Sequence, residues 1–519
     1  MRKKKAVIFV TLAVAITVFT IFSACDLPQT GGTCASVESL QRSLGVTASV
    51  TAVASGDNFC LALASDGTVW ATGQNNHGQL GLGDTTDRRV WTQTPAGNTQ
   101  AIACGARFSL LVSNGNVWAT GENGVGQLGL GDTTDRSSWT QTPAGHTQAI
   151  ACGANHSLLI SNGKVWVTGY NNSGQLGLGD STNRLNWTPT SITNASAIAC
   201  GVLYSLLIRD GNVWATGYNR YGQLGMGNTT FYYSWTQTPA GHTQAIACGN
   251  NHSLLLSDGN VWATGYNAYG QLGLGDTTER HSWTPTSAGN TQSIAGGGDH
   301  SLLISGGNVF VTGNNGSGQL GLGDFTTRKN WTSTAATNVK AVAGGDLHSV
   351  ILSGGKIRET GWNAYGQLGL GKDATTRSSF TLCPDDLYQY YNSGLGDHFY
   401  TASWSELGGG SGGYVSEGAT CYVYATQVTG TIPLYRYYSG GQGDHFYTTN
   451  WYELGNGNGG YTYEGVACYV YSSQTTGTVP LYRYYSGSQG DHYYTTNWYE
   501  LRSGRGGYTY EGITCYVLP

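Results

Sequence analysis

The stretch Gly174-Gln175-Leu176-Gly177-Leu178-Gly179 decides the fold, because the same hexapeptide recurs through most of the chain. Only one of its seven copies differs, with Met226 in place of the second leucine. The copies begin at Gly78, Gly126, Gly174, Gly222, Gly270, Gly318 and Gly366, so every step is 48 residues long. A fixed period of this length is typical of propellers, solenoids and other repeat arrays.

The repeat that contains this stretch shows what one unit folds into. Apolar segments at 149–151, 157–160 and 164–168 predict three short strands, and the region around Trp187 predicts a fourth. Asn162-Gly163 separates two of these segments, and Asn-Gly between apolar runs is a strong hairpin signal. Seven four-stranded units predict a seven-bladed β-propeller over residues 47–382. We expect its first and last segments to complete one composite blade.

Composition supports an all-β protein and argues against several functions. Glycine accounts for 80 of the 519 residues, about twice its ordinary share, and only 11% of residues are charged. The net charge is −5, and the basic residues gather only at Arg2 to Lys5. A nucleic-acid-binding surface needs a basic patch, so we expect no nucleic-acid partner.

The N-terminus carries an export signal. The basic cluster precedes an apolar run from Ala6 to Ala24, which is the pattern of a signal peptide. The run ends Phe22-Ser23-Ala24-Cys25, which resembles a bacterial lipobox. We therefore expect residues 1–24 to be removed, Cys25 to be lipidated and residues 25–46 to form a tether. The protein would then sit at the cell envelope or outer surface through its lipid anchor. Cleavage with secretion and an uncleaved anchor are the alternatives.

Most cysteines fall at repeat positions, which predicts buried core residues and not disulfides. Equivalent strands of neighbouring blades lie about 10 Å apart, too far for a bridge. These cysteines are Cys60, Cys104, Cys152, Cys200, Cys248, Cys421, Cys468 and Cys515. Cys34 and Cys383 flank the propeller, and a disulfide between them is a hypothesis. The chain has no CxxC pair, so we expect no zinc site.

A different repeat fills residues 384–519. Gly-Asp-His followed by two aromatic residues begins at Gly396, Gly443 and Gly490, at intervals of 47 residues. The second copy suggests four strands, at 434–439, 444–449, 460–464 and 467–471. Three four-stranded copies predict a β-trefoil-like domain.

Two family resemblances follow from these motifs. The pattern Ala-Cys-Gly-x-x-His-Ser-Leu-Leu, Asn-Gly-x-Val-Trp-x-Thr-Gly-x-Asn and Gly-Gln-Leu-Gly-Leu-Gly resembles the regulator-of-chromosome-condensation repeat. The resemblance implies a seven-bladed propeller, in a family that includes a nuclear guanine-nucleotide exchange factor, a secreted β-lactamase inhibitor and many scaffolds. The C-terminal pattern Pro-Leu-Tyr-Arg-Tyr-Tyr…Gly-Asp-His-Phe-Tyr-Thr-Thr is similar to an uncharacterised repeat domain of extracellular microbial proteins.

The candidate binding face of the propeller lies where the copies differ. The residue before each hexapeptide is variable, and the ring's symmetry places all seven such residues on one face. The fourth copy also loses the Asp-x-x-x-Arg pair of its neighbours. Aromatic residues at these places are Tyr170, Tyr218, Tyr221, Phe231, Tyr232, Tyr266, Tyr269, Trp362 and Tyr365. Such side chains suit a protein or sugar partner, because they bring large contact area at low entropic cost.

Two other recurrent motifs favour structural roles. His156, His252, His300 and His348 share one repeat position, which Phe or Tyr fills in the other copies, so a common catalytic base is excluded. The Asp-x-x-x-Arg pairs, such as Asp84 and Arg88, stand in the loop after the hexapeptide and suit bidentate pairing between blades.

The C-terminal domain offers a second set of candidates. Its triplicated Asp-His dipeptides and tryptophans suggest either internal hydrogen bonding or three equal ligand pockets. The candidates are Asp397, His398, Trp404, Asp444, His445, Trp451, Asp491, His492 and Trp498. Trp451, Tyr435, Tyr437 and Glu453 together would suit sugar stacking. The first copy departs from the others, with Gln389 in place of Arg436 and Arg483.

These observations predict a binding protein and not an enzyme. The chain shows no phosphate loop, HExxH or GxSxG motif, so we expect no catalytic residues, cofactor or metal. Our interpretation is an exported lipoprotein that serves as a binding or scaffold module for a protein or glycan partner. A secreted propeller-type enzyme inhibitor is the alternative. An exchange-factor-like regulator fits poorly with the export signal.

Overall fold

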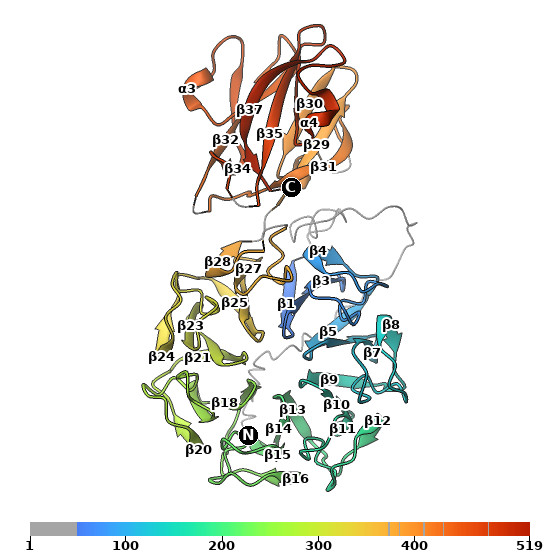
Figure 1. Cartoon of the computed structure of the whole chain (residues 1–519), viewed down its shortest axis with the longest axis vertical. Coiled ribbons are helices and arrows are strands. Elements are labelled where there is room, and N and C mark those ends of the chain that lie inside the picture. Colours follow the sequence, from blue (N-terminus) through green and yellow to red (C-terminus); the bar gives the residue numbers. More distant parts are fainter. Residues whose placement is uncertain are drawn as a thin grey trace, which may run out of the picture.

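The computed structural model describes residues 49–371, 374–382, 385–407, 410–428, 430–475 and 477–518. Apart from three one-turn helices, its regular secondary structure is entirely strand, which confirms the all-β class. The first part forms four-stranded antiparallel sheets that follow one another along the chain and are arranged as the blades of a ring (Figure 1). Cys25 and Cys34, together with Cys383, lie outside the described residues.

The first four sheets run from residue 50 to residue 237. Their strands are β1 (Val50–Ser55), β2 (Phe59–Ala64), β3 (Val69–Gly73), β4 (Arg88–Gln93), β5 (Thr99–Cys104), β6 (Phe108–Ser113), β7 (Asn116–Gly121), β8 (Arg136–Gln141), β9 (Thr147–Cys152), β10 (His156–Ser161), β11 (Lys164–Gly169), β12 (Arg184–Pro189), β13 (Ala195–Cys200), β14 (Tyr204–Arg209), β15 (Asn212–Gly217) and β16 (Tyr232–Gln237).

Three more sheets continue the pattern to residue 382. Their strands are β17 (Ala245–Cys248), β18 (His252–Ser257), β19 (Asn260–Gly265), β20 (Arg280–Pro285), β21 (Thr291–Gly296), β22 (His300–Ser305), β23 (Asn308–Gly313), β24 (Arg328–Ser333), β25 (Val339–Gly344), β26 (His348–Ser353), β27 (Lys356–Gly361) and β28 (Arg377–Leu382).

The expected hairpin turn joins the second and third strands of a blade. Asn162 and Gly163 have φ values of 51° and 72°, both in the left-handed region that a type I′ turn requires. Ser161 pairs with Lys164 across this turn, and the register continues to His156 opposite Gly169. Both faces of the central strand are buried, with Leu158 and Ile160 in one apolar cluster and Leu159 in another, which accounts for its nearly continuous apolar sequence.

The hexapeptide joins each blade to the next. A Cβ atom on Gly81 would lie 2.4 Å from Nε1 of Trp139, which belongs to the following blade, so only glycine fits beneath the indole. The amide of Gly83 donates to the carbonyl of Ser137, and Leu82 forms a bridge with Ser138. A Trp or Phe of the next blade stands in the same position over the corresponding glycine of the other copies. This contact therefore recurs between each blade and the next.

The last hexapeptide closes the ring on the first blade. Gly369 lies under Trp91, and the amide of Gly371 donates to the carbonyl of Arg89. Val50, Trp91 and Val350 share one apolar cluster between the first and last blades. The expectation of a composite blade was wrong, because β1–β4 and β25–β28 are each continuous in sequence. Side-chain packing and the hexapeptide bridge close the ring without exchange of a strand.

The C-terminal domain consists of three equivalent units. In each unit, the first strand pairs on one side with a short strand and on the other side with a bulged strand. A one-turn helix connects the short strand to the bulged strand. The elements are β29 (Asp385–Asn392), β30 (Asp397–Thr401), α2 (Trp404–Leu407), β31 (Val415–Val423), β32 (Thr431–Ser439), β33 (Asp444–Thr448), α3 (Trp451–Leu454), β34 (Thr462–Tyr471), β35 (Val479–Ser486), β36 (Asp491–Thr495), α4 (Trp498–Leu501) and β37 (Thr509–Val517).

Four strands per copy was a wrong expectation. The segments expected at 460–464 and 467–471 form the single strand β34, because the register shifts between Leu434 and Tyr435 without breaking the pairing. Each copy therefore has three strands in the described residues. The trefoil-like arrangement stays a prediction.

Three buried tyrosines hold the copies together. The hydroxyl of Tyr447 donates to the carbonyl of Tyr400 at 2.8 Å and accepts the amide of Tyr400 at 2.7 Å. Tyr494 binds the backbone of Tyr447 in the same way, and Tyr400 binds that of Tyr494. All three side chains are about 1% exposed. Each hydroxyl thus satisfies the backbone of a neighbouring short strand that has no sheet partner on that side.

The cysteines that the structure describes are unbridged, as expected. Cys60, Cys421, Cys468 and Cys515 are buried, as predicted. The prediction of core positions was wrong for the four others, which are half-buried because they line a cavity enclosed by the innermost strands: Cys104, Cys152, Cys200 and Cys248. Burial raises the pKa of Cys152 and Cys200 well above the ordinary value, so these thiols stay protonated and unreactive.

We predict that Tyr447→Phe destabilises the C-terminal domain by roughly 2–5 kcal/mol. The substitution leaves the buried amide and carbonyl of Tyr400 without their shared partner, and each such group costs about 1–3 kcal/mol. Urea unfolding of the full chain would measure the effect. Tyr452→Phe is the matched control, because that side chain is 93% exposed. Equal stability of the two variants would contradict the proposed role of the hydroxyl.

Candidate functional site

One turn geometry positions the variable residue before every hexapeptide. In the fourth blade the amide of Gly222 donates to the carbonyl of Asn219, and the amide of Tyr221 donates to the side chain of Gln223. The Asn219 side chain accepts the amide of Leu224, which ties the turn to the buried leucine of the hexapeptide. The same contacts surround Tyr269, so the turn presents both tyrosines in equivalent ways.

Five of the candidate aromatic residues form one continuous surface, which we call the aromatic ladder. Ring centroids of Phe231 and Tyr218 lie 4.7 Å apart, and those of Tyr218 and Tyr221 lie 6.2 Å apart. Tyr221 then reaches the next blade, 4.9 Å from Tyr266, which lies 6.4 Å from Tyr269. The two ends, Phe231 and Tyr269, are 37% and 40% exposed. The ladder therefore spans two blades and opens to solvent.

The other aromatic candidates lie outside the ladder. Trp362 and Tyr365 are exposed on the seventh blade, and Tyr170 is half-buried on the third. Tyr232 is half-buried and packs against the apolar cluster between the fourth and fifth blades, so its place on the binding face stays a prediction. Its hydroxyl accepts from Asn228 at 3.0 Å, in the place of the ion pair that other blades carry.

The Asp-x-x-x-Arg pairs are structural ion pairs. One terminal nitrogen of Arg88 donates to Asp84 at 2.6 Å, and the other donates to the carbonyl of Thr86. The expectation of a bidentate contact was therefore wrong. The other oxygen of Asp84 accepts from Asn75, the asparagine that organises the hexapeptide turn. Four more blades repeat the 2.6 Å contact.

Acidic residues at the ring axis were missed by sequence reasoning. A cavity of about 200 Å³ runs along the axis between the innermost strands. Burial and the nearby carboxylate of Asp346 raise the pKa of Asp57 to about 6, and the same causes act on Asp299. The signal was present, because the position of Asp57 varies among copies and holds Ala106 and Asn250 elsewhere.

The Asp and His residues of the C-terminal domain form a closed network. Each aspartate binds the histidine of another copy: Nδ1 of His445 lies 2.6 Å from Asp397, His492 lies at the same distance from Asp444, and His398 lies 2.7 Å from Asp491. Asp and His of one copy do not pair, as their opposite faces on a strand predicted. Burial lowers the pKa of His445, but hydrogen bonds to Asp397 and Glu464 outweigh it and raise the pKa overall.

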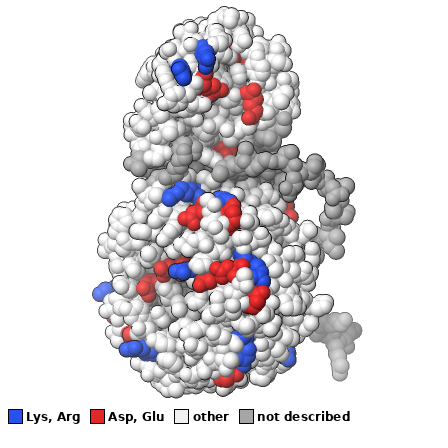
Figure 2. All heavy atoms as spheres, turned by 45° about the vertical axis from the view of Figure 1, so that its right-hand side comes forward, with Lys and Arg blue, Asp and Glu red and all other residues white. Residues whose placement is uncertain are grey.

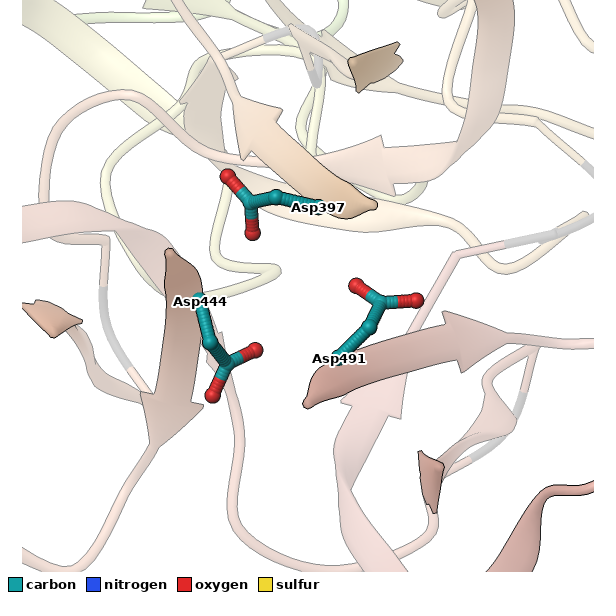
Figure 3. Close-up of side chains that lie close together, drawn as sticks. All are labelled: Asp397, Asp444 and Asp491. Carbon is teal, nitrogen blue, oxygen red and sulfur yellow. The ribbon is translucent and has the colours of Figure 1, made fainter. Parts of the chain in front are cut away.

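The three aspartates also lie close enough to one another to suggest a metal site. Their carboxylates surround a shared centre, and one oxygen of each lies within 4.8 Å of the others (Figure 3). However, Asp397 already accepts from the amide and the ring of His445 and from Tyr414. The other two aspartates have equivalent partners. The arrangement is therefore explained by the network that links the copies.

Two of the C-terminal tryptophans pack against tyrosines. The ring of Trp451 lies 5.0 Å from Tyr435 and 5.1 Å from Tyr463, and Trp498 has equivalent neighbours. Tyr437 was wrongly grouped with a stacking surface, because its side chain is fully buried. The side chain of Trp404 lies outside the described part of the structure.

Comparison with known families accounts for both repeats. The sequence profile of the RCC1-like domain matches residues 28–288 and 141–402, which together cover more than half of the chain. The chain belongs to the RCC1-like domain family. The profile of a domain of unknown function (DUF5648) matches residues 357–471 and 386–518.

Individual relatives of this RCC1-like protein match it over short segments. The Danio rerio protein RCC2 homolog is 46% identical over 66 residues, which is 12% of this chain and 13% of that protein. The Mus musculus X-linked retinitis pigmentosa GTPase regulator is 44% identical over 64 residues, which is 12% of this chain and 6% of that protein. The chain thus matches only a small part of the length of these relatives.

Solved structures share the propeller. Prp20p from Saccharomyces cerevisiae, described with its binding to Gsp1p and histones, has a TM-score of 0.57 at 22% identity, over 62% of this chain and 87% of that chain. Yeast RCC1 (Prp20) with bound Kap60 has a TM-score of 0.56 at 20% identity, over 71% and 91%. Human WBSCR16 has a TM-score of 0.52 at 23% identity, over 59% and 86%. Likeness at these identities shows the fold alone.

The repeated histidines of this RCC1-like propeller link neighbouring blades. Nε2 of His156 lies 2.9 Å from the hydroxyl of Ser205 in the next blade. That hydroxyl donates its hydrogen to the carbonyl of Gln175, so His156 must donate through Nε2. His252 and His300 make the equivalent contacts with Ser301 and Ser349, and Nε2 of His348 lies 3.1 Å from the sulfur of Cys60 across the ring closure. The expected packing role fits these contacts.

No helix in the part of the chain that the structure describes is both long enough and apolar enough to cross a bilayer.

We predict that His156 makes the RCC1-like propeller sensitive to acid. Burial lowers the pKa of His156 from 6.5 to about 3, so the unfolded chain takes up a proton below pH 6.5 that the folded chain excludes. Its stabilising contribution is therefore complete above pH 6.5 and is lost as the pH falls. His156→Phe removes this loss and copies the residue of the first two blades.

Urea unfolding at pH 7 and pH 5 would test this. The stability of His156→Phe relative to the unsubstituted protein should rise by about 2 kcal/mol between these values. Phe108→His is the reciprocal control, because Ser157 of the next blade stands where Ser205 stands for His156. It should increase the acid sensitivity. A stability difference that does not change with pH would contradict the buried, neutral imidazole.

Proposed function

We propose that this RCC1-like protein is a binding module that captures a protein partner with its aromatic ladder. The continuous contact from Phe231 to Tyr269 across two blades is the observation that carries the proposal. Rings that already pack together lose little freedom on binding, and exposed Tyr and Trp side chains are frequent energetic centres of protein interfaces. Seven blades in one closed ring would hold this surface rigid.

The partner's class rests on surface chemistry and on the solved relatives. On the face that Figure 2 shows, acidic and basic side chains lie beside one another and most of the remaining surface is uncharged. Such a surface favours shape and aromatic contact over long-range attraction of a charged polymer. Gsp1p, histones and Kap60 are partners of the yeast protein, and they support a protein as the class of partner here.

We also propose that the module is exported and anchored through Cys25. The basic cluster, the apolar run of residues 6–24 and the lipobox-like ending support this location. A lipid-anchored module would present the ladder at the cell envelope, to a protein of the envelope or of the surroundings. The C-terminal domain would then add a second surface, for a protein or a glycan.

We predict that Tyr221→Ala combined with Tyr269→Ala weakens partner binding at least tenfold. Each truncated side chain at an interface centre costs about 1–2 kcal/mol. Immobilised full chain would be exposed to envelope and host extracts, and captured proteins would be compared by quantitative mass spectrometry. The partner is the protein lost by the double variant.

Tyr233→Ala is the matched control for this experiment. Tyr233 is 39% exposed on the same blade but lies outside the ladder. Its replacement should leave capture unchanged, and the thermal melts of both variants should match that of the parent. A protein retained equally by the double variant would place its binding site elsewhere. A signal on a glycan array that survives in the double variant would favour the glycan alternative.

We predict that the mature protein begins at a lipidated Cys25. Mass spectrometry of membrane-extracted protein should show loss of residues 1–24 and a diacylglyceryl group on the new N-terminal cysteine. Cys25→Ser should leave the protein with its signal uncleaved and unlipidated. An intact protein that starts at residue 26 or later in the soluble fraction would contradict the anchor and support secretion.

A further inference from the structure

Two of the three copies of the C-terminal domain fill an equivalent pocket with an arginine. In the second copy, a terminal nitrogen of Arg436 lies 2.7 Å from Glu406, and Nε lies 2.9 Å from Glu464. The guanidinium stacks 4.7 Å from the ring centroid of Phe399. The two glutamates come from different copies, so the arginine sits at the junction between copies.

The third copy repeats this pocket with its own residues. Arg483 lies 3.4 Å from Glu453 and 2.9 Å from Glu511, and it stacks 4.7 Å from Phe446. The two pockets thus share a ring beneath the guanidinium and one carboxylate on each side of it. This combination suits a planar, permanently charged group with several donors.

The first copy has the same walls without the arginine. Gln389 takes the arginine's place and donates to Glu417 at 2.6 Å, while Tyr493 takes the place of the phenylalanine and donates to Glu500 at 2.8 Å. Glu500 also accepts from Thr495 at 2.8 Å, and Nε2 of His398 lies 3.7 Å from Glu417, but neither glutamate has a guanidinium partner here. Glu417 remains 42% exposed at the side chain, against 32% for Glu464. Two carboxylates therefore face this pocket without the guanidinium that balances them elsewhere.

A cavity of about 410 Å³ opens beside Gln389. Its lining comprises Gln389, His398, Glu417, Tyr493, Glu500, Leu501 and Tyr508, and we call it the Gln389 pocket. Nδ1 of His398 is held by Asp491, so this ring forms a fixed wall. The ring of Tyr493 stands where Phe399 and Phe446 support an arginine in the other pockets.

We propose that the Gln389 pocket binds a guanidinium group from outside the chain, either of free arginine or of an arginine side chain in a polypeptide. The two filled pockets show the complex that this architecture makes: a guanidinium between carboxylates of two copies, on an aromatic ring. An ammonium group is a compact point charge and cannot reach both carboxylates in one plane while stacking. The proposal does not depend on the aromatic ladder, which belongs to the propeller.

Calorimetric titration of the full chain with N-acetyl-arginine amide would test the pocket. We expect saturable binding of one equivalent, and at least tenfold weaker binding of N-acetyl-lysine amide. Free arginine distinguishes the two sources: tighter binding of the amide identifies an arginine within a polypeptide, and equal or tighter binding of the free amino acid identifies the small molecule. Lysine amide binding as strongly as arginine amide, or no saturation at concentrations on the order of 10 mM, would overturn the proposal.

Substitutions can close the pocket or duplicate it. Gln389→Arg with Tyr493→Phe copies the composition of the filled pockets, and it should reduce arginine amide binding at least tenfold without lowering the melting temperature. Glu500→Gln should also weaken binding, and it keeps the size of the side chain. Unchanged binding by either variant would place the ligand elsewhere and overturn the proposal.

The reciprocal variant, Arg483→Gln with Phe446→Tyr, copies the Gln389 pocket into the third copy. If it melts as the parent does, it should bind a second equivalent, and a stoichiometry that stays at one would overturn the proposal. Tyr221→Ala with Tyr269→Ala should bind arginine amide normally. This result separates failure of the pocket from failure of the ladder.

Discussion

The contact between the hexapeptide of one blade and the outer strand of the next is the interaction on which the propeller depends. A glycine such as Gly81 must lie beneath an indole, and the following glycine must donate to the backbone of the neighbouring strand. Both contacts recur from blade to blade, even where one residue more separates Gly321 from Phe380 than Gly81 from Trp139. The ring closes through the contact between Gly369 of the last hexapeptide and Trp91 of the first blade. These two residues lie at opposite ends of the propeller sequence.

In the C-terminal domain, neighbouring copies are joined by side chains and not by a loop such as the hexapeptide. The hydroxyl of Tyr447 stands in for a missing strand beside Tyr400, and the carboxylate of Asp397 holds the backbone and ring of His445. In both domains, therefore, groups that one copy cannot satisfy are satisfied by the next copy. These contacts recur from copy to copy. The aromatic ladder and the Gln389 pocket also join neighbouring copies, but they lie at positions where the residues of the copies differ.

The level at which sequence reasoning succeeded differs from feature to feature. The strands and hairpins of a blade could be predicted, because apolar alternation and Asn162-Gly163 act within a few residues of one another. The five ladder residues were among the predicted candidates, but which of the candidates contact one another could not be predicted, and neither could the hydrogen bond from Asn228 to Tyr232. Two strands of the second C-terminal unit were separated wrongly, since a bulge keeps β34 continuous where the pattern suggested a break. Gln389 was noted as a departure, but its pocket depends on Tyr493 and Glu500 from another copy.

The sequence by itself determined the period of both repeats, the strands within a blade and the positions where copies differ. These features follow from local periodicity and turn chemistry, which a single unit carries in full. Only the tertiary structure decided which copies touch. It placed Tyr221 against Tyr266 and Glu500 beside Gln389. It also paired His398 of the first copy with Asp491 of the third copy, which is far away in the sequence. Identical repeats are interchangeable in sequence, so the choice among them rests on the three-dimensional closure of each ring.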